Sequence, residues 1–124
     1  MTYNNISNLI SSVNMASKNK RTECSVENSY ELLKICEVFF SEGLLSSYKK
    51  KNNKIVLSLK YHGHRCVIKD IRPVSLRGSK VTLDRIKLRK ERCKYLVRTN
   101  RGIMMSTTNY NKLIGGEVLM EILY

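Results

Sequence analysis

The sequence predicts an α/β (α+β) fold in two small lobes, an N-terminal α-β-α-β-β lobe and a C-terminal β-rich lobe with one short helix. Two segments of the first half place apolar residues at helical spacing, whereas most later segments are short apolar runs that read as strands. The only proline, Pro73, falls between these regions, so we expect lobes at 1–72 and 73–124, the second beginning with a basic linker. The 124 residues, 42% of them hydrophobic, suffice for two lobes sharing a core.

The first expected helix covers residues 4–16. Ile6, Leu9, Ile10 and Val13 fall at i, i+3, i+4 and i+7 and form one apolar stripe. The opposite face is uncharged and rich in hydrogen-bonding groups, which fits either a solvated surface or one that meets sugar and phosphate oxygens. Its members are Ser7, Asn8, Ser11, Ser12 and Asn14.

A short strand is expected at 22–26, followed by a second helix with a wide apolar face. Asn28 is the expected cap of this helix, with Glu31 three residues on as its reciprocal partner, and Gly43 ends it. The remaining expected elements are a polar turn at 49–53, strands at 55–61, 66–71 and 95–97, a turn at 98–102, a strand at 103–105, a short helix from Ser106 to about residue 113, and a strand at 118–124.

Charge is concentrated in the middle of the chain. Residues 49–101 hold 18 basic and three acidic groups and so carry a net charge of +15. Each of the two flanking segments has a net charge of −1, which leaves +13 for the whole chain. Such asymmetry favours a polyanionic partner, because each neutralised phosphate releases counterions. The alternative interpretation is a basic protein with a solvated face.

Sequence motifs for catalysis and membrane insertion are missing. We expect no enzyme and no cofactor, since neither a nucleophile elbow nor a phosphate-binding glycine loop occurs. No apolar run approaches the roughly 20 residues that cross a bilayer, so no membrane partner is expected. The N-terminus lacks the features of a secretory or Arg-rich transit segment, so we expect an import segment to have been removed or the protein to be made where it works.

The cysteines are irregularly spaced and form no C-x-x-C pair, which favours reduced thiols over a disulfide or zinc scaffold. His62, His64 and Cys66 alternate, so on one strand they would share a face and could seed a metal-assisted site. Gly63 between them favours a polar turn instead. The four cysteines are Cys24, Cys36, Cys66 and Cys93.

The turn at 98–102 is well equipped to bind RNA. Arg98 and Arg101 offer guanidinium forks for phosphate, Thr99 and Asn100 offer groups for ribose and base edges, and Gly102 permits close backbone approach. An ordinary basic hairpin turn is the equally simple alternative.

Several motifs resemble one family. Residues 97–104 read Val-Arg-Thr-Asn-Arg-Gly-Ile-Met and residues 114–119 read Ile-Gly-Gly-Glu-Val-Leu, which is similar to the Val-Ser-Thr-Ser-Lys-Gly-Val/Ile-Met and Gly-Gly-Glu signature of bacterial-type small-subunit ribosomal protein eight. Residues 73–81 and 6–11 resemble the family's middle and opening motifs, so the likeness covers essentially the whole chain. Two serines of the family's Ser-Thr-Ser turn are Arg98 and Asn100 here, and the middle-motif proline is Arg77.

The resemblance implies a structural protein of the small ribosomal subunit that binds the central domain of small-subunit rRNA and contacts neighbouring ribosomal proteins. The shallow minor groove of A-form RNA displays 2′-hydroxyls, which suit short polar side chains. Glu117 would orient the turn or accept from a base amino group. The expected RNA-binding residues are Ser11, Asn14, Lys18, Ser75, Arg77, Lys80, Arg98, Thr99, Asn100, Arg101, Ser106 and Glu117.

The divergent turn favours an organellar ribosome. The residues Asn, Ile, Lys and Tyr, which have AT-rich codons, number 11, 10, 14 and 7, as in many mitochondrial genomes. Plastid members tend to keep the serine turn, so we expect a mitochondrial protein and keep the plastid as the alternative location. A general basic nucleic-acid-binding module outside the ribosome is the alternative function.

Overall fold

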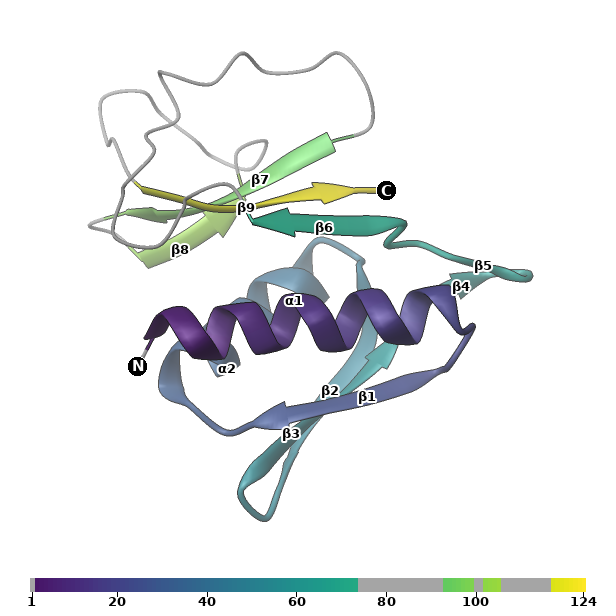
Figure 1. Cartoon of the computed structure of the whole chain (residues 1–124), viewed down its shortest axis with the longest axis horizontal. Helices are drawn as coiled ribbons and strands as arrows, with labels where there is room; N and C mark the ends of the chain where they lie inside the picture. The colour runs from purple at the N-terminus through teal and green to yellow at the C-terminus, as the bar shows by residue number, and fades with distance from the viewer. Residues whose placement is uncertain (1, 74–92, 100–101, 106–116) are drawn as a thin grey trace. The chain divides into compact units, whose positions relative to one another are not determined.

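A computed structural model describes residues 2–73, 93–99, 102–105 and 117–124 (Figure 1). The chain divides into two compact units, Met1–Asp70 and Ile71–Tyr124. Both are built from antiparallel strands, and the first also carries two helices, so the predicted two-lobed α+β class is confirmed. Within the part of the chain that the model describes, no helix has the length and apolar character needed to span a membrane.

In the first unit, two helices cover a three-stranded sheet of order β1-β3-β2. The helices are α1 (Thr2–Lys18) and α2 (Tyr30–Ser41), and the strands are β1 (Glu23–Glu27), β2 (Leu45–Lys51) and β3 (Lys54–Leu59). Helix α1 packs on β1 and α2 on β2. A small hairpin of β4 (Tyr61–His62) and β5 (Arg65–Cys66) follows.

The apolar stripe of α1 forms part of the core, as its spacing predicts. Leu9 and Val13 are fully buried, and Ile10 is nearly so. On β3, the alternate residues Ile55, Leu57 and Leu59 are buried while their neighbours stay accessible, the period-2 pattern of a sheet covered on one face. The other face of this sheet, called here the open face, carries Glu23, Ser25, Glu27, Ser47, Lys49, Lys51, Lys54, Val56 and Ser58, as the strand register requires.

Helix α2 begins one residue later than predicted. Its N-cap is Ser29, whose hydroxyl accepts from the Leu32 backbone N–H at 3.1 Å, so the expected cap at Asn28 is wrong. The end at Gly43 is as predicted, because this residue has a φ of +78°, which favours glycine.

Two other expectations for this unit are also wrong. Residues 49–51 belong to β2 and not to a polar turn, because they pair with β3 and leave only Asn52 and Asn53 to connect the strands. The expected strand at 66–71 is instead two short strands, β5 and β6 (Asp70–Pro73), separated by residues 67–69. Ile68 in that break is fully buried, and its carbonyl accepts from the Ser17 hydroxyl of α1 at 2.7 Å, so this carbonyl bonds a helix and not a neighbouring strand.

The second unit contains a four-stranded sheet of order β6-β9-β7-β8. Its other strands are β7 (Cys93–Thr99), β8 (Gly102–Met105) and β9 (Glu117–Leu123). Pro73 ends β6 and so belongs to the sheet, where the sequence predicted the start of a linker. The expected helix from Ser106 and most of the basic linker lie outside the described residues.

Strand β9 is an inner strand whose residues 118–122 are all buried. Its register with β7 shifts between Leu96 and Val97, because Leu96 faces Met120 whereas Val97 faces Val118. Leu119 is therefore the extra residue of a β-bulge.

Candidate nucleic-acid interface

The predicted turn residues Arg98 and Thr99 are the last two residues of β7. Arg98 faces Ile103 of β8 and Glu117 of β9, and Thr99 faces Gly102. The hairpin strands therefore extend further than predicted, and Gly102, at a φ of +110°, begins the returning strand in a conformation that favours glycine.

Glu117 holds Arg98 in place. The Arg98 Nη1 atom donates to the Glu117 Oε1 atom at 3.3 Å, and the two side chains are 37% and 22% exposed. The β-bulge causes this pairing, because the register beyond Leu119 would otherwise set Arg98 opposite Val118. The role of Glu117 in orienting the turn, one of its two expected roles, agrees with this geometry.

The Thr99 hydroxyl closes the same end of the sheet. It donates to the Gly102 carbonyl at 2.7 Å across the hairpin. A hydroxyl that donates its proton keeps acceptor capacity on its oxygen, which is the capacity needed to accept from a ribose 2′-hydroxyl. Two neighbouring strands thus present a guanidinium, a hydroxyl and a carboxylate at three adjoining positions. We call these residues, Arg98, Thr99 and Glu117, the sheet-end cluster.

The predicted residues of the first helix also share a surface. Ser11, Asn14 and Lys18 are spaced by three and four residues, so they lie along one side of α1. Ser11 and Lys18 are exposed and Asn14 is half-buried. The structure brings these three together on one helix, and it brings the sheet-end cluster together on one sheet. The other expected residues lie outside the described residues; they are Ser75, Arg77, Lys80, Asn100, Arg101 and Ser106.

The His62, His64 and Cys66 motif forms a hairpin and not one strand. Its connection contains Gly63 at a φ of +65° and His64, so the three side chains do not share a strand face. Over the described ranges, no group of three or more His, Cys, Asp or Glu is placed to hold a metal ion.

The three cysteines whose side chains are described are free thiols, in agreement with the prediction from their irregular spacing. Cys24, Cys36 and Cys66 form no disulfide, and Cys36 lies on the buried face of α2 and is itself fully buried. Burial, followed by the nearby Cys24 and Glu37, raises the pKa of Cys36 to about 12. Burial and the nearby Cys66 likewise raise the pKa of Cys24 to about 11. These thiols therefore stay protonated and are poor nucleophiles.

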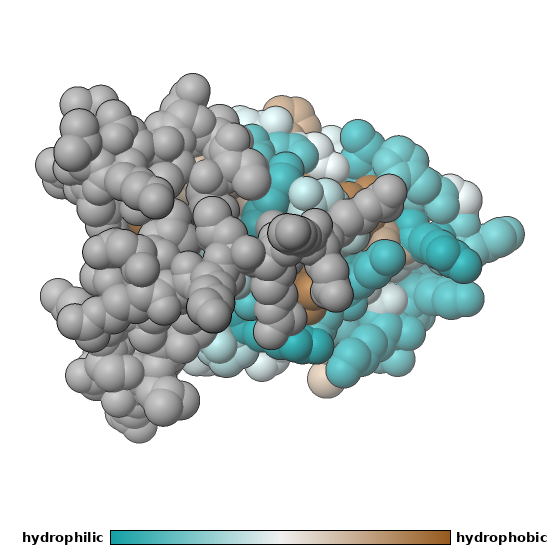
Figure 2. Space-filling view, turned by 90° about the horizontal axis from the view of Figure 1, so that it is seen from above, coloured by the Kyte–Doolittle hydropathy of each residue, from teal (hydrophilic) through white to brown (hydrophobic). Residues whose placement is uncertain are grey.

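A second basic region, absent from the predicted site residues, lies at the β2–β3 hairpin. Lys49, Lys50, Lys51 and Lys54 are all exposed there, and the run of lysines before Asn52 was the available signal. Hydrophilic residues dominate the described surface in Figure 2, with only small hydrophobic areas between them. Fold and charge thus define a small basic α+β protein whose polar hairpin ends suit a polyanionic partner.

Comparison with known proteins identifies the family. The family model for ribosomal protein S8 matches residues 4–123, so the chain belongs to the ribosomal protein S8 family. It is 27% identical to small ribosomal subunit protein uS8 of Mycoplasmopsis pulmonis, over 94% of each chain. It is also 27% identical to small ribosomal subunit protein uS8m of Acanthamoeba castellanii, over 94% of this chain and 97% of that one. With uS8 of Wolinella succinogenes it shares 31% identity over 73% of this chain and 76% of the relative.

Membership of this family makes the chain a structural protein of the small ribosomal subunit, a class that is generally not enzymatic. It also implies association with small-subunit rRNA and with other ribosomal proteins. The resemblance expected from the sequence motifs is therefore confirmed.

Proposed function

We propose that this protein binds the central domain of small-subunit rRNA in a mitochondrial ribosome and supports assembly of that subunit. The observation that carries the proposal is the sheet-end cluster, in which Glu117 orients Arg98 and the Thr99 hydroxyl follows at the next position of β7. An oriented guanidinium can bind phosphate bidentately, and a hydroxyl at the same end of the strand suits the 2′-hydroxyls of the RNA minor groove.

The predicted neighbours of this cluster extend the proposed contact. Asn100 and Arg101 directly follow Thr99 in the sequence and add amide and guanidinium groups, and Ser106, which follows β8, adds a hydroxyl. Ser75, Arg77 and Lys80 belong to the motif that resembles the family's middle signature, and Ser11, Asn14 and Lys18 form a further polar surface on α1.

The mitochondrial location is supported by the uS8m relative and by the excess of residues with AT-rich codons. The other two relatives described above are bacterial, so the location needs its own test. The protein should sediment with mitochondrial small subunits after a high-salt wash. Sedimentation with plastid subunits, or with neither, would contradict the proposed location.

The proposed contact is tested with a central-domain rRNA stem and a duplex of unrelated sequence. If about six phosphates are neutralised, log K falls with log salt at a slope of roughly −4 to −5. Thr99→Val should weaken the cognate stem by about 2- to 10-fold, because one net hydrogen bond is lost. Thr99→Ser should retain affinity, and Thr22→Val, at an exposed position of the first unit, is the matched control.

Equal loss of affinity on both RNAs with Thr99→Val would contradict the assigned cluster. The alternative function, a general nucleic-acid binder outside the ribosome, predicts equal affinity for duplex DNA and the RNA stem. Its support is the net +15 of residues 49–101, which does not itself specify sequence.

A further inference from the structure

The end of the β2–β3 hairpin concentrates positive charge on the first unit. Within six residues it carries Lys49, Lys50, Lys51 and Lys54, and all four side chains are exposed. The structure gives none of these lysines an ion pair with any residue it describes. Glu27 of β1 faces Lys54 without forming an ion pair with it, whereas Lys49, Lys50 and Lys51 have no acidic residue opposite them on β3.

The strand register places three of these lysines on one face. Lys49 faces Val56, and Lys51 faces Lys54, so these lysines lie on the open face, the side of the sheet turned away from α1 and α2. Lys50 faces the buried residue Ile55 and so lies on the opposite side of the hairpin.

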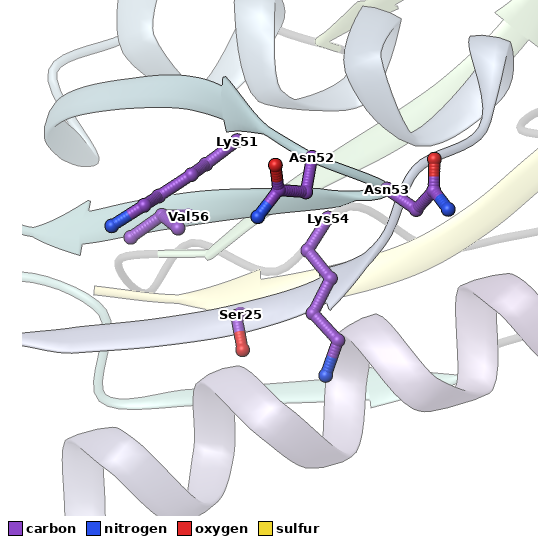
Figure 3. Close-up of a pocket in the computed structure, with 6 residues that line it drawn as sticks. All are labelled: Ser25, Lys51, Asn52, Asn53, Lys54 and Val56. Carbon is purple, nitrogen blue, oxygen red and sulfur yellow. The ribbon is translucent and has the colours of Figure 1, made fainter.

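The Lys51–Lys54 pair is unfavourable in the free protein. Like charges directly opposite each other on neighbouring strands destabilise a sheet. Figure 3 shows the two side chains extending from the hairpin in different directions. A bound polyanion would remove this repulsion, whereas the folded chain alone gains nothing from it.

The hairpin end has a defined shape. Asn52 connects the strands at a φ of +56°, a conformation that asparagine tolerates, and the Asn53 carbonyl accepts from the Asn28 backbone N–H at 2.8 Å. The hollow here has a volume of about 350 Å³ (Figure 3). Its lining residues are Ser25, Lys51, Asn52, Asn53, Lys54 and Val56.

We propose that the lysine face of the β2–β3 hairpin, formed by Lys49, Lys51 and Lys54 around this hollow, is a second RNA contact that binds the phosphate backbone. The chemistry selects phosphates because the lysines supply point charges without a guanidinium fork, and the neighbouring asparagine and serine groups can bond sugar and phosphate oxygens. The inference rests on the proposed function in taking RNA as the partner. It adds a sequence-independent contact on the unit that lacks the sheet-end cluster.

The test compares two full-length variants that lose the same charge. Lys49→Gln/Lys51→Gln removes two lysines from the proposed face. The control Lys50→Gln/Lys69→Gln removes two exposed lysines of the same unit that lie off this face, one on the opposite side of the hairpin and one outside the sheet. Binding is measured against salt for the central-domain stem with its flanking helices and for a plain A-form duplex. The first variant should reduce the magnitude of the salt slope by about 1.5 on both RNAs, since each phosphate contact contributes roughly 0.7 to 0.9.

The control variant should keep the slope of the native protein. Equal reductions in both variants would overturn the proposal, because undirected charge would then explain the effect. Unchanged slopes with weaker sedimentation on small subunits would also overturn it, in favour of an acidic protein neighbour. At low salt the Lys49→Gln/Lys51→Gln protein should unfold at an equal or higher denaturant concentration than the native protein, which shows that any loss of binding is not a loss of folding.

These outcomes are separable from the proposed function. If the protein shows no preference for the central-domain stem, the proposed function fails. The effect of Lys49→Gln/Lys51→Gln on the plain duplex would still support the hairpin as a phosphate contact. If the preference is present but the hairpin variant binds like its control, only this inference fails.

Discussion

The Arg98–Glu117 pair provides a quantitative test of the sheet-end cluster. The atoms Nη1 and Oε1 are 3.3 Å apart, and the side chains are partly covered. Exposed ion pairs contribute about 0.2 to 1 kcal/mol, and we expect a value at the upper end because the two strands hold these charges opposite each other. A coupling near 1 kcal/mol corresponds to roughly a 5-fold change in an equilibrium constant.

The coupling is measured with a double-mutant cycle. Arg98→Met, Glu117→Gln and the double variant are unfolded in urea, and the interaction energy is the part of the loss that is not additive. The coupling should shrink in 1 M salt, where the Debye length is about 3 Å. Glu37→Gln is the matched control, because Glu37 is also a partly exposed carboxylate, 3.6 Å from Lys34 in the other unit.

RNA binding by the Glu117→Gln variant shows whether Glu117 acts by positioning Arg98 or only through its negative charge. Removal of a negative charge should slightly strengthen binding to a random duplex. Loss of the oriented guanidinium should lower the ratio of stem to duplex affinity by about 2- to 5-fold, the same range as the coupling energy. A coupling below about 0.2 kcal/mol together with an unchanged affinity ratio would refute the positioning role.

Three further predictions concern folding. Ser29→Ala should destabilise the protein by about 1 kcal/mol in urea unfolding, because a helix N-cap is lost, whereas Asn28→Ala should have little effect. A larger loss of stability with Asn28→Ala than with Ser29→Ala would identify Asn28 as the cap. Gly102→Ala should lower the unfolding free energy by about 1–2 kcal/mol through backbone strain at a φ of +110°. The added Cβ meets no atom within 4 Å, so a steric clash does not contribute, and an unchanged unfolding midpoint would exclude the strain. The folded-state pKa values of Cys36 and Cys24, about 12 and 11, lie above the ordinary 9.0, so their contribution to stability is complete below pH 9 and is lost as pH rises toward these values. Cys36→Ala should therefore flatten the alkaline fall in unfolding free energy, and an unchanged slope would contradict the assignment.

Hydropathy periodicity predicted the secondary structure well where one face of an element is buried. The stripe of Leu9 and Val13 located α1, and the alternation of Ile55 and Leu57 located β3, because burial imposes these spacings. Periodicity could not place β2, whose end is a run of exposed lysines stabilised by pairing with β3. It also missed the break at Ile68, where the carbonyl bonds a helix that is distant in sequence.

The candidate site was predictable in residue type and not in arrangement. Arg98, Thr99 and Glu117 were identified from polar composition and from the family signature. Their contacts depend on an unpredicted bulge, because Leu119 leaves no mark in the hydrophobic pattern of a strand buried throughout. The cap at Ser29 was missed because Asn28 beside it is an equally good capping residue by type.

Leu119 divides β9 into two segments with independent alignment to β7. From Met120 to Leu123 the strand follows one offset, which the buried side chains enforce, and at Val118 and Glu117 it follows another. Substitutions at Glu117 can therefore change the charged end of the strand without disturbing its apolar half. Deleting Leu119 would remove the bulge and still leave Arg98 opposite Glu117, because Val118 and Glu117 would then continue the offset of Met120.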